Sequence, residues 1–226
     1  MSKMSWVYGL HTVEALLNTE PERVLELQAM DTREDARLNP LVKQARQLGL
    51  PVSFRDRNAL DQLAEGGRHQ GIVARIRERQ AGDDNDLQAL LDGLSAPPLL
   101  LILDAVTDPH NLGACLRTAE AAGVHAVVCP RDKAVGLTPV VRKQLQERGV
   151  WVIGTSLGDG AKPFYDIDLK GPLAIVMGAE GTGLRRLTAE LCDHLAYIPM
   201  AGQIESLNVS VATGVALFEA VRQRAR

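Results

Sequence analysis

The sequence predicts an α/β protein with a small N-terminal domain and a larger, mostly parallel C-terminal domain. After residue 98, short apolar runs alternate with stretches of helical periodicity, which is typical of a parallel sheet covered by helices on both faces. The first run, Leu99–Leu103, is apolar at every position, as expected of a strand buried on both sides. We therefore place an N-terminal α/β domain at residues 1–79, a polar linker at 80–98 and the parallel domain at 99–226.

Each domain has its own order of elements. In the C-terminal domain we expect strands at 99–103, 125–129, 150–154, 173–177 and 195–198, and helices at 112–122, 139–148, 187–192 and 207–224. In the N-terminal domain we expect strands at 24–30, 52–54 and 72–76, and helices at 11–17, 39–48 and 58–63. Leucines at helical spacing predict one short helix within the linker. The last helix is apolar around much of its circumference, so we expect it to be largely buried.

Composition narrows the classes of function. Apolar residues make up 46% and charged residues 23% of the 226 residues, which is typical of a soluble protein with a packed core. The longest apolar run, from Pro97 to Val106, is too short to cross a bilayer, and no signal peptide is expected at the start. Cys115, Cys129 and Cys192 form neither a disulfide framework nor a metal-ligand spacing. We expect a cytoplasmic protein without a metal.

The charge pattern leaves RNA binding open. A net charge of −3 argues against binding of nucleic acid over the whole surface, but not against a local basic site. Arginines cluster in one stretch of the N-terminal domain and at the C-terminus: Arg68, Arg75, Arg77, Arg79, Arg222, Arg224 and Arg226. Solvated surface and RNA-binding surface explain these clusters equally well.

Three polar or glycine-rich segments follow strands of the predicted parallel sheet. They are residues 104–118, 178–183 and 198–212. Because ligands of open parallel sheets bind beyond the carboxyl ends of the strands, these segments are the candidate site. Each also has a purely structural interpretation: turns for the glycines, and helix capping for polar residues such as Ser206. Capping explains one of Ser206, Asn208 and Ser210, not all three.

Together the three segments resemble the motifs of the SpoU-type RNA 2′-O-ribose methyltransferases of the SPOUT superfamily. The matching residues are Asn111-Leu112-Gly113 with Arg117-Thr118, then Met177 to Gly183, then Ile198-Pro199-Met200 with Ser206 to Ala212. Tyr8-Gly9-Leu10-His11 and His69-Gln70-Gly71-Ile72 resemble the N-terminal domain of family members that methylate a guanosine of bacterial 23S rRNA. The resemblance covers nearly the full length.

The resemblance implies a fold, a cofactor and partners. The C-terminal domain would be a trefoil-knotted α/β domain, and the N-terminal domain would have a fold like ribosomal protein L30 and bind 23S rRNA. The protein would be a homodimer whose active sites are completed across the interface. Gly178, Ile198, Met200 and Leu207 would bind S-adenosyl-L-methionine.

The resemblance also implies catalytic residues for methyl transfer to a ribose 2′-hydroxyl, which makes the substrate RNA. They are Arg117, Asn111, Ser206, Asn208 and Glu180. Asn111, Ser206 and Asn208 would orient the ribose and the cofactor carboxylate. Arg117 is described in the family as a general base, but a guanidinium stays protonated. Phosphate binding and stabilisation of the developing negative charge are the alternative role.

One departure from the family pattern lies at Lys143–Gln144. In the family, the helix that begins near Thr138 continues into a glycine- and alanine-rich stretch with a glutamate, followed by another strand. Here Lys143 is followed at once by Gln144 to Arg148, which resembles the end of a later helix. We predict that Lys143 and Gln144 are not joined by a peptide bond and that tens of residues are missing between them. A true deletion is the alternative.

Three other functions remain open. A tRNA 2′-O-methyltransferase is the nearest, although the minimal tRNA enzymes lack the N-terminal domain. A non-catalytic RNA-binding protein on the same fold would explain the missing stretch but not the polar site residues. A nucleotide-dependent oxidoreductase is disfavoured because the G-x-G-x-x-G fingerprint is absent.

Overall fold

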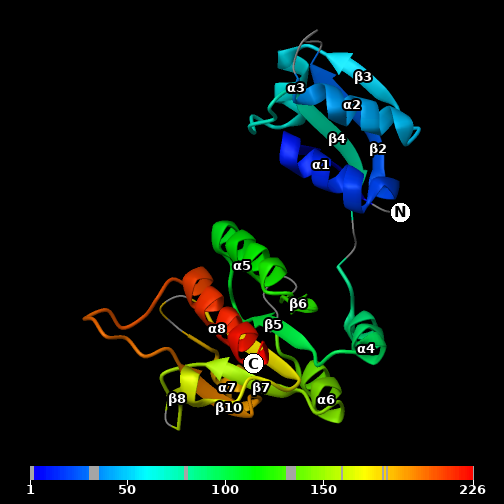
Figure 1. Ribbon diagram of the computed structural model, residues 1–226. Coiled ribbons are helices and arrows are strands. Elements are labelled where there is room, and N and C mark those ends of the chain that lie inside the picture. Colours follow the sequence, from blue (N-terminus) through cyan, green and yellow to red (C-terminus); the bar gives the residue numbers. More distant parts are fainter. Residues whose placement is uncertain are drawn as a thin grey trace. The chain divides into compact units, whose positions relative to one another are not determined.

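The computed structural model describes residues 3–30, 36–78, 81–130, 136–158, 160–179, 181 and 183–225. The chain divides into two compact units, Met1–Ala81 and Gly82–Arg226 (Figure 1). Both are α/β, as predicted. Glu180 of the predicted site, and Arg79 and Arg226 of the arginine clusters, lie outside the described residues.

The N-terminal unit is a four-stranded sheet in the order β1-β4-β2-β3. Its strands are β1 (Met4–Tyr8), β2 (Val24–Met30), β3 (Val52–Arg55) and β4 (Ile72–Arg77), and its helices are α1 (Leu10–Thr19), α2 (Leu38–Gln47) and α3 (Arg57–Leu63), with a 3₁₀ turn at Pro21–Arg23. β4 pairs antiparallel with β1 and β2, and β3 joins β2 in parallel. The sequence did not predict β1, an edge strand without a buried residue.

The side chains of β4 point alternately to the two faces of this sheet, which explains why helices cover both faces. Ile72, Ala74 and Ile76 are buried in the cluster formed with α1 and α2. Val73 points the other way, into a second cluster with Leu60 of α3. Successive side chains of a strand point to opposite faces, so one strand serves both cores. The L30-like identity of this unit stays a prediction.

The C-terminal unit is a six-stranded sheet in the order β6-β5-β9-β7-β10-β8, and every pairing among its described strands is parallel. The strands are β5 (Leu99–Leu103), β6 (Ala126–Val128), β7 (Trp151–Thr155), β8 (Lys162–Pro163), β9 (Leu173–Met177) and β10 (His194–Tyr197). The helices are α4 (Asp84–Gly93), α5 (Pro109–Ala121), α6 (Pro139–Glu147), α7 (Arg186–Glu190) and α8 (Val209–Arg224), with a 3₁₀ turn at Phe164–Asp166. The predicted parallel sheet is confirmed; the sequence missed only the two-residue β8 among these strands.

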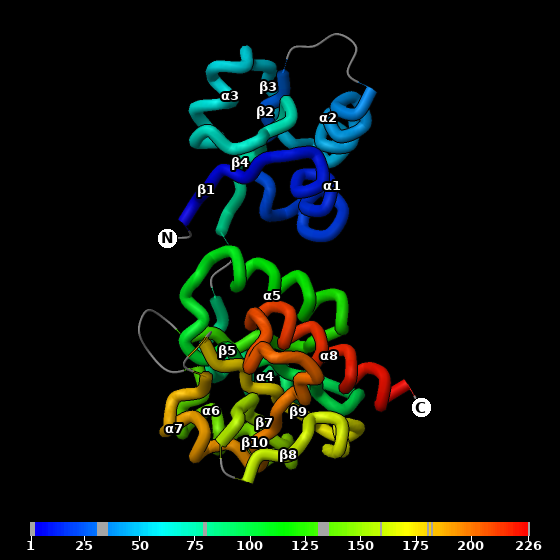
Figure 2. Tube along the Cα trace, turned by 90° about the vertical axis from the view of Figure 1, so that its left-hand side faces the viewer, coloured from blue at the N-terminus to red at the C-terminus, as the bar shows by residue number. Residues whose placement is uncertain are grey.

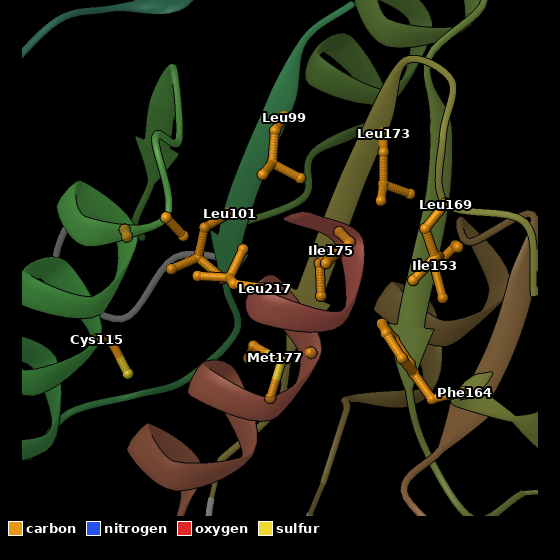
Figure 3. Close-up of a cluster of buried hydrophobic side chains, with 14 of the residues drawn as sticks. Leu99, Leu101, Cys115, Ile153, Phe164, Leu169, Leu173, Ile175, Met177 and Leu217 are labelled. Atoms are coloured by element: carbon orange, nitrogen blue, oxygen red, sulfur yellow. The ribbon is translucent and has the colours of Figure 1, made fainter. Parts of the chain in front are cut away.

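The central strands of this sheet, β5 and β9, are buried at every residue. On one face, Leu101 and Ile175 pack against Cys115 of α5 and Leu217 of α8 (Figure 3). On the other face, Leu100 and its neighbours pack against α4 and α6. α5 and α8 lie side by side in both overall views (Figures 1 and 2). The uniformly apolar run of β5 is thus explained by helices on both faces.

The segment predicted as a linker contains α4, which packs on the C-terminal unit. Asp83 caps this helix in a reciprocal capping box with Asp86. Leu91 is buried in the core shared with α6, and Asp92 forms an ion pair with Arg148 at 2.6 Å. Residues from Gly82 onward therefore belong to the second compact unit.

In this structure Lys143 and Gln144 both lie inside α6, and the absence of residues between them stays a prediction. Thr138 caps the helix, its Oγ1 accepting the amide of Val141 at 3.1 Å. Lys143 pairs with Glu147 one turn later, and the carbonyl of Gln144 accepts a bond from Arg148. The helix is continuous across the junction.

The last helix differs from its prediction in two ways. It begins at Val209, and its N-cap is Asn208, not Ser206. It also leaves one side uncovered in this chain, with Val211 52% and Phe218 49% exposed. Threading of the C-terminal segment through a loop stays a prediction. No helix among the described residues is long and apolar enough to span a membrane.

Candidate cofactor pocket and active site

A cavity of about 420 Å³ lies at the carboxyl end of the parallel sheet. The loops after β7, β9 and β10 line it together with the start of α8. All four predicted cofactor residues are among its walls: Gly178, Ile198, Met200 and Leu207. Ser206 also lines it. Segments far apart in the sequence therefore meet where the strand order predicted a ligand.

Gly178 is required by the path of the loop after β9. A Cβ atom at this position would lie 2.3 Å from the carbonyl carbon of Gly183 and 2.5 Å from the amide nitrogen of Leu184. The loop folds back on itself, and Ala179 and Gly183 exchange two backbone hydrogen bonds of 3.2 and 3.0 Å. The glycine therefore permits a close approach between two parts of the same loop, which forms one wall of the pocket.

A fully buried carboxylate, Asp104, anchors the other end of this loop. Its Oδ2 accepts the backbone amide of Arg185 at 3.0 Å, and its Oδ1 lies 3.1 Å from Nε of the same arginine. Asp104 follows β5 directly, and its own amide donates to the carbonyl of Met177 at 2.7 Å. The end of β5 is thus tied to both ends of the pocket loop. Asp104 was not among the predicted site residues.

The first and third motifs meet through two asparagines. Asn208 Nδ2 donates to Asn111 Oδ1 at 3.0 Å, across 97 positions of sequence. Asp108 caps α5 by accepting the amides of His110 and Asn111. Asn208 caps α8, its Oδ1 accepting the amide of Ser210 at 2.9 Å. The two helix starts therefore present a joined pair of amide side chains beside the pocket wall formed by Ser206 and Leu207.

Arg117 does not join this group. It is exposed, and it is not among the described residues that line the pocket. It follows Asn111 by six residues, which at about 100° per residue places it about 120° away around α5. Asn111 and Arg117 therefore do not share one helical face. Arg117 instead shares the solvent-facing side of α5 with Leu116, which is 43% exposed.

The part of the pocket that follows β7 was not predicted from the sequence. Thr155, Ser156, Leu157 and Gly158 line the cavity there, as does Tyr197 at the end of β10. Ligands of open parallel sheets bind beyond the carboxyl ends of the strands, and this holds for β7 as well, because β7 was predicted and its carboxyl end lies at the same edge of the sheet. A serine and a glycine directly after this strand were the available signal.

Thiol and metal chemistry find no support in the described residues. Burial raises the pKa of the Cys115 thiol, and burial beside Asp193 raises the pKa of Cys192 to about 12. Both thiols are therefore protonated at neutral pH and are poor nucleophiles. No cluster of three His, Cys, Asp or Glu residues suited to a metal occurs in the part of the chain that the structure describes.

Comparison with known families identifies the architecture. The model of the SpoU rRNA methylase family matches residues 98–143 and 139–218, which carry the pocket. The chain belongs to the SpoU rRNA methylase family. A second model, described as the substrate-binding domain of RNA 2′-O ribose methyltransferases, matches residues 6–81, which is nearly the whole N-terminal unit.

Relatives match this SpoU family chain from end to end. It is 51% identical to the 23S rRNA (guanosine-2′-O-)-methyltransferase RlmB of Shewanella oneidensis, over 99% of both chains. It is 51% identical to the RlmB protein of Pseudomonas aeruginosa, over 99% of this chain and 98% of the relative.

Solved structures agree on the fold of both units. A crystal structure of an RNA 2′-O ribose methyltransferase superposes with a TM-score of 0.77 at 24% identity, covering 100% of this chain and 90% of the other. The SpoU methyltransferase AviRb from Streptomyces viridochromogenes gives a TM-score of 0.75 at 24% identity, covering 98% of this chain and 90% of the other.

The same comparisons locate a difference in length. The alignment with the Shewanella protein spans 246 positions, whereas this chain has 226 residues, so at least 20 positions have no counterpart here. The family match divides at residues 139–143, where its two segments overlap. The division falls in the first half of α6, where the sequence departs from the family pattern.

Gly178→Ala tests the pocket wall. The added methyl group would overlap the backbone of Gly183 and Leu184, so the loop must move at a cost of about 1–3 kcal/mol. We expect the affinity for S-adenosylmethionine to fall about tenfold or more, measured by calorimetry. Gly171→Ala is the matched control, because no heavy atom lies within 4 Å of its Cβ position. Equal affinity of the two variants would contradict the assignment of this wall.

Proposed function

We propose that this chain transfers a methyl group from S-adenosyl-L-methionine to the ribose 2′-hydroxyl of a guanosine in 23S rRNA, acting in the cytoplasm. The observation that supports this most directly is the pocket, in which the family's cofactor residues line one cavity at the carboxyl end of the sheet. Relatives about half identical over nearly the whole chain carry the name of this activity.

The pocket suits the cofactor's mixed chemistry. Leu184, Ile198 and Leu207 give apolar surface for a purine, while Ser156 and Ser206 give hydroxyl groups for its polar parts. When bound, S-adenosylmethionine supplies an electrophilic methyl group on a sulfonium. The tasks of the chain are to hold, orient and stabilise the reacting groups. Gly178, Ile198, Met200 and Leu207 are proposed to hold the cofactor.

The remaining site residues are proposed to act on the RNA. Asn111 and Asn208 are hydrogen bonded to each other, and together they retain amide groups to orient the ribose. Ser206 lines the cavity and is proposed to orient the cofactor carboxylate. Glu180 is also proposed as a catalytic residue, because it belongs to the second family motif, Met177 to Gly183. Arg117 is proposed to bind the adjacent phosphate and to stabilise the negative charge that develops as the hydroxyl loses its proton.

A homodimer accounts for the position of Arg117. Val211, Val215 and Phe218 form an uncovered stripe along α8 at helical spacing, and Leu116 is exposed on the neighbouring α5. An exposed apolar stripe of this kind favours contact with a second copy. Arg117 is next to Leu116, so a contact over this stripe would carry Arg117 to the partner's site. We propose that each pocket is completed by Arg117 of the partner.

The reaction is tested with full-length protein, labelled S-adenosylmethionine and unmodified 23S rRNA fragments. We expect label on a ribose oxygen of a guanosine, located by mapping the modified nucleotide. A tRNA pool is the comparison substrate, because a tRNA methyltransferase is the main alternative. Label on tRNA alone would overturn the proposed substrate, and label on neither RNA would favour a non-catalytic RNA-binding protein.

Arg117→Ala should lower turnover about 100-fold or more, the usual effect of losing a charge-stabilising donor. Affinity for the cofactor should stay unchanged, because Arg117 does not line the described pocket. Arg117→Lys should recover little turnover, because an ammonium group cannot donate the two parallel hydrogen bonds of a planar guanidinium. Glu120→Ala, exposed one turn further along α5, is the control. Near-normal turnover of Arg117→Ala would exclude this role.

Mixing Arg117→Ala with Gly178→Ala, at a cofactor concentration too low to fill the pocket of Gly178→Ala, tests whether the site is shared between subunits. Arg117→Ala retains its own pocket, and Gly178→Ala retains Arg117. In a mixed dimer one site combines the intact pocket with the intact arginine, so equal mixing should restore about a quarter of the normal turnover. Sedimentation establishes the dimer independently. A dimer without recovery on mixing would place Arg117 in the site of its own chain.

A further inference from the structure

A second hollow lies in the N-terminal unit. It measures about 520 Å³ and is bounded by the loop 66–71, by α3 and by the start of α2. Its described walls include Arg37, Arg57 and Arg68, with Asp61 as the one carboxylate. The volume suits a group the size of a nucleotide.

Hydrogen bonds of His69 hold the loop that forms this hollow. The buried ring of His69 accepts the amide of Gly71 on Nδ1 at 3.0 Å. Its proton therefore lies on Nε2, which donates to Asp61 Oδ1 at 3.0 Å. Gln70 and Gly71 both have positive φ, 54° and 84°. The loop is thus fixed in one shape before any ligand arrives.

The charge of the hollow stands out within its unit. Residues 1–81 contain twelve Lys and Arg against eleven Asp and Glu, so the unit as a whole is nearly neutral. Attraction to a polyanion must then come from a local concentration of charge. With three arginines and one carboxylate, the charged residues of the described walls sum to about +2, and all three arginines are exposed.

Several arginines elsewhere in the unit are engaged within the protein. Arg23 pairs with Glu20. Arg75 lies 3.3 Å from Glu26, and the guanidinium of Arg46 lies over the ring of Phe54. Arg57, by comparison, is 3.9 Å from Asp61, which is already bonded to His69. The long ion pair leaves most of the hydrogen-bonding capacity of Arg57 available to a ligand.

An aromatic side chain lies next to this loop. A Cβ atom on Gly67 would lie 2.2 Å from Cζ of Tyr8, so the tyrosine ring is in direct contact with the loop backbone. Tyr8 is 40% exposed. Nearby, Gln70 Oε1 accepts the amide of Leu10 at 3.1 Å. The motif that begins at Tyr8 and the motif that begins at His69, about 60 residues apart, thus meet at one edge of the hollow.

We propose that this hollow binds single-stranded RNA, with a backbone phosphate held by Arg57 and Arg68 and a neighbouring base stacked on Tyr8. Arginine forks match the geometry of a phosphate, and an exposed aromatic ring accepts any unstacked base. A duplex keeps its bases stacked and offers none to a tyrosine. This proposal rests on the proposed function, for which it names the surface of the N-terminal unit that holds the substrate.

The arginines are tested in the full chain by titrating labelled, single-stranded 23S rRNA fragments. We expect Arg57→Ala and Arg68→Ala each to weaken binding about tenfold, the loss of one charge-assisted contact. Each should also lower the slope of log affinity against log salt by about one. Arg75→Ala removes the same charge from the same unit outside the hollow and should change affinity less than about twofold. Cofactor affinity should not change.

Tyr8 is tested by a pair of variants. Tyr8→Phe keeps the aromatic ring and should bind single-stranded RNA with normal affinity. Tyr8→Leu keeps apolar contact with Gly67 but loses the ring, so its affinity for the RNA should fall about tenfold, the effect of losing one stacked base. A duplex of the same sequence should respond to neither change.

Equal affinity of the Arg57, Arg68 and Arg75 variants would overturn the phosphate site, and equal affinity of the two Tyr8 variants would overturn the stacking. Both results are independent of turnover. A wild-type chain that binds RNA through this hollow but transfers no methyl group would refute the proposed function and leave the binding site standing. Normal methyl transfer together with equal RNA binding by all variants would refute the binding site and leave the proposed function standing.

Discussion

The parallel pairing of β5 with β9 is the constraint on which the site depends. Leu103 lies opposite Met177 at the carboxyl ends of the two strands, so the loops that follow begin side by side. Asp104 then joins them, because its carboxylate is fully buried and its partner, Arg185, belongs to the loop after β9. Removing Arg185 would leave the buried carboxylate without its partner charge, which is unfavourable because a buried charge needs compensation. A buried charge at this point therefore selects one arrangement of the pocket wall.

The helices α5 and α8 place the remaining site residues at the same edge of the sheet. α5 starts after the loop of Asp104, and α8 starts after the loop that follows β10, so both helix starts lie at the same edge of the sheet. Their packing brings Cys115 within 3.5 Å of Thr213, both buried, which fixes the two axes close together. Asn111 and Asn208 can then bond at the first turns. The opposite sides of the same helices remain exposed, at Leu116 of α5 and at Val211 and Phe218 of α8.

The sequence predicted best what depends on local pattern. Strands such as β5 and β9 were clear because burial on both faces leaves an uninterrupted apolar run. β1 was missed because an edge strand has no such run, and the first cap of α8 was misplaced because Ser206 and Asn208 are equally suited to that position. The contact of Tyr8 with Gly67 and the pairing of Asp104 with Arg185 join distant residues. No periodicity encodes them, and they follow only from the fold.

The segment at α6 combines a departure from the family with a regular helical pattern. The departure from the family at Lys143–Gln144 suggested a broken chain, yet the joined sequence forms a consistent amphipathic helix. Val141 precedes the junction and Leu145 follows it, and both are buried in the same core, one helical turn apart. The helix then ends normally, with Gly149 at a positive φ of 64° and the amide of Val150 bonded back to Leu145. Residues from both sides of the junction therefore contribute to one buried face of α6.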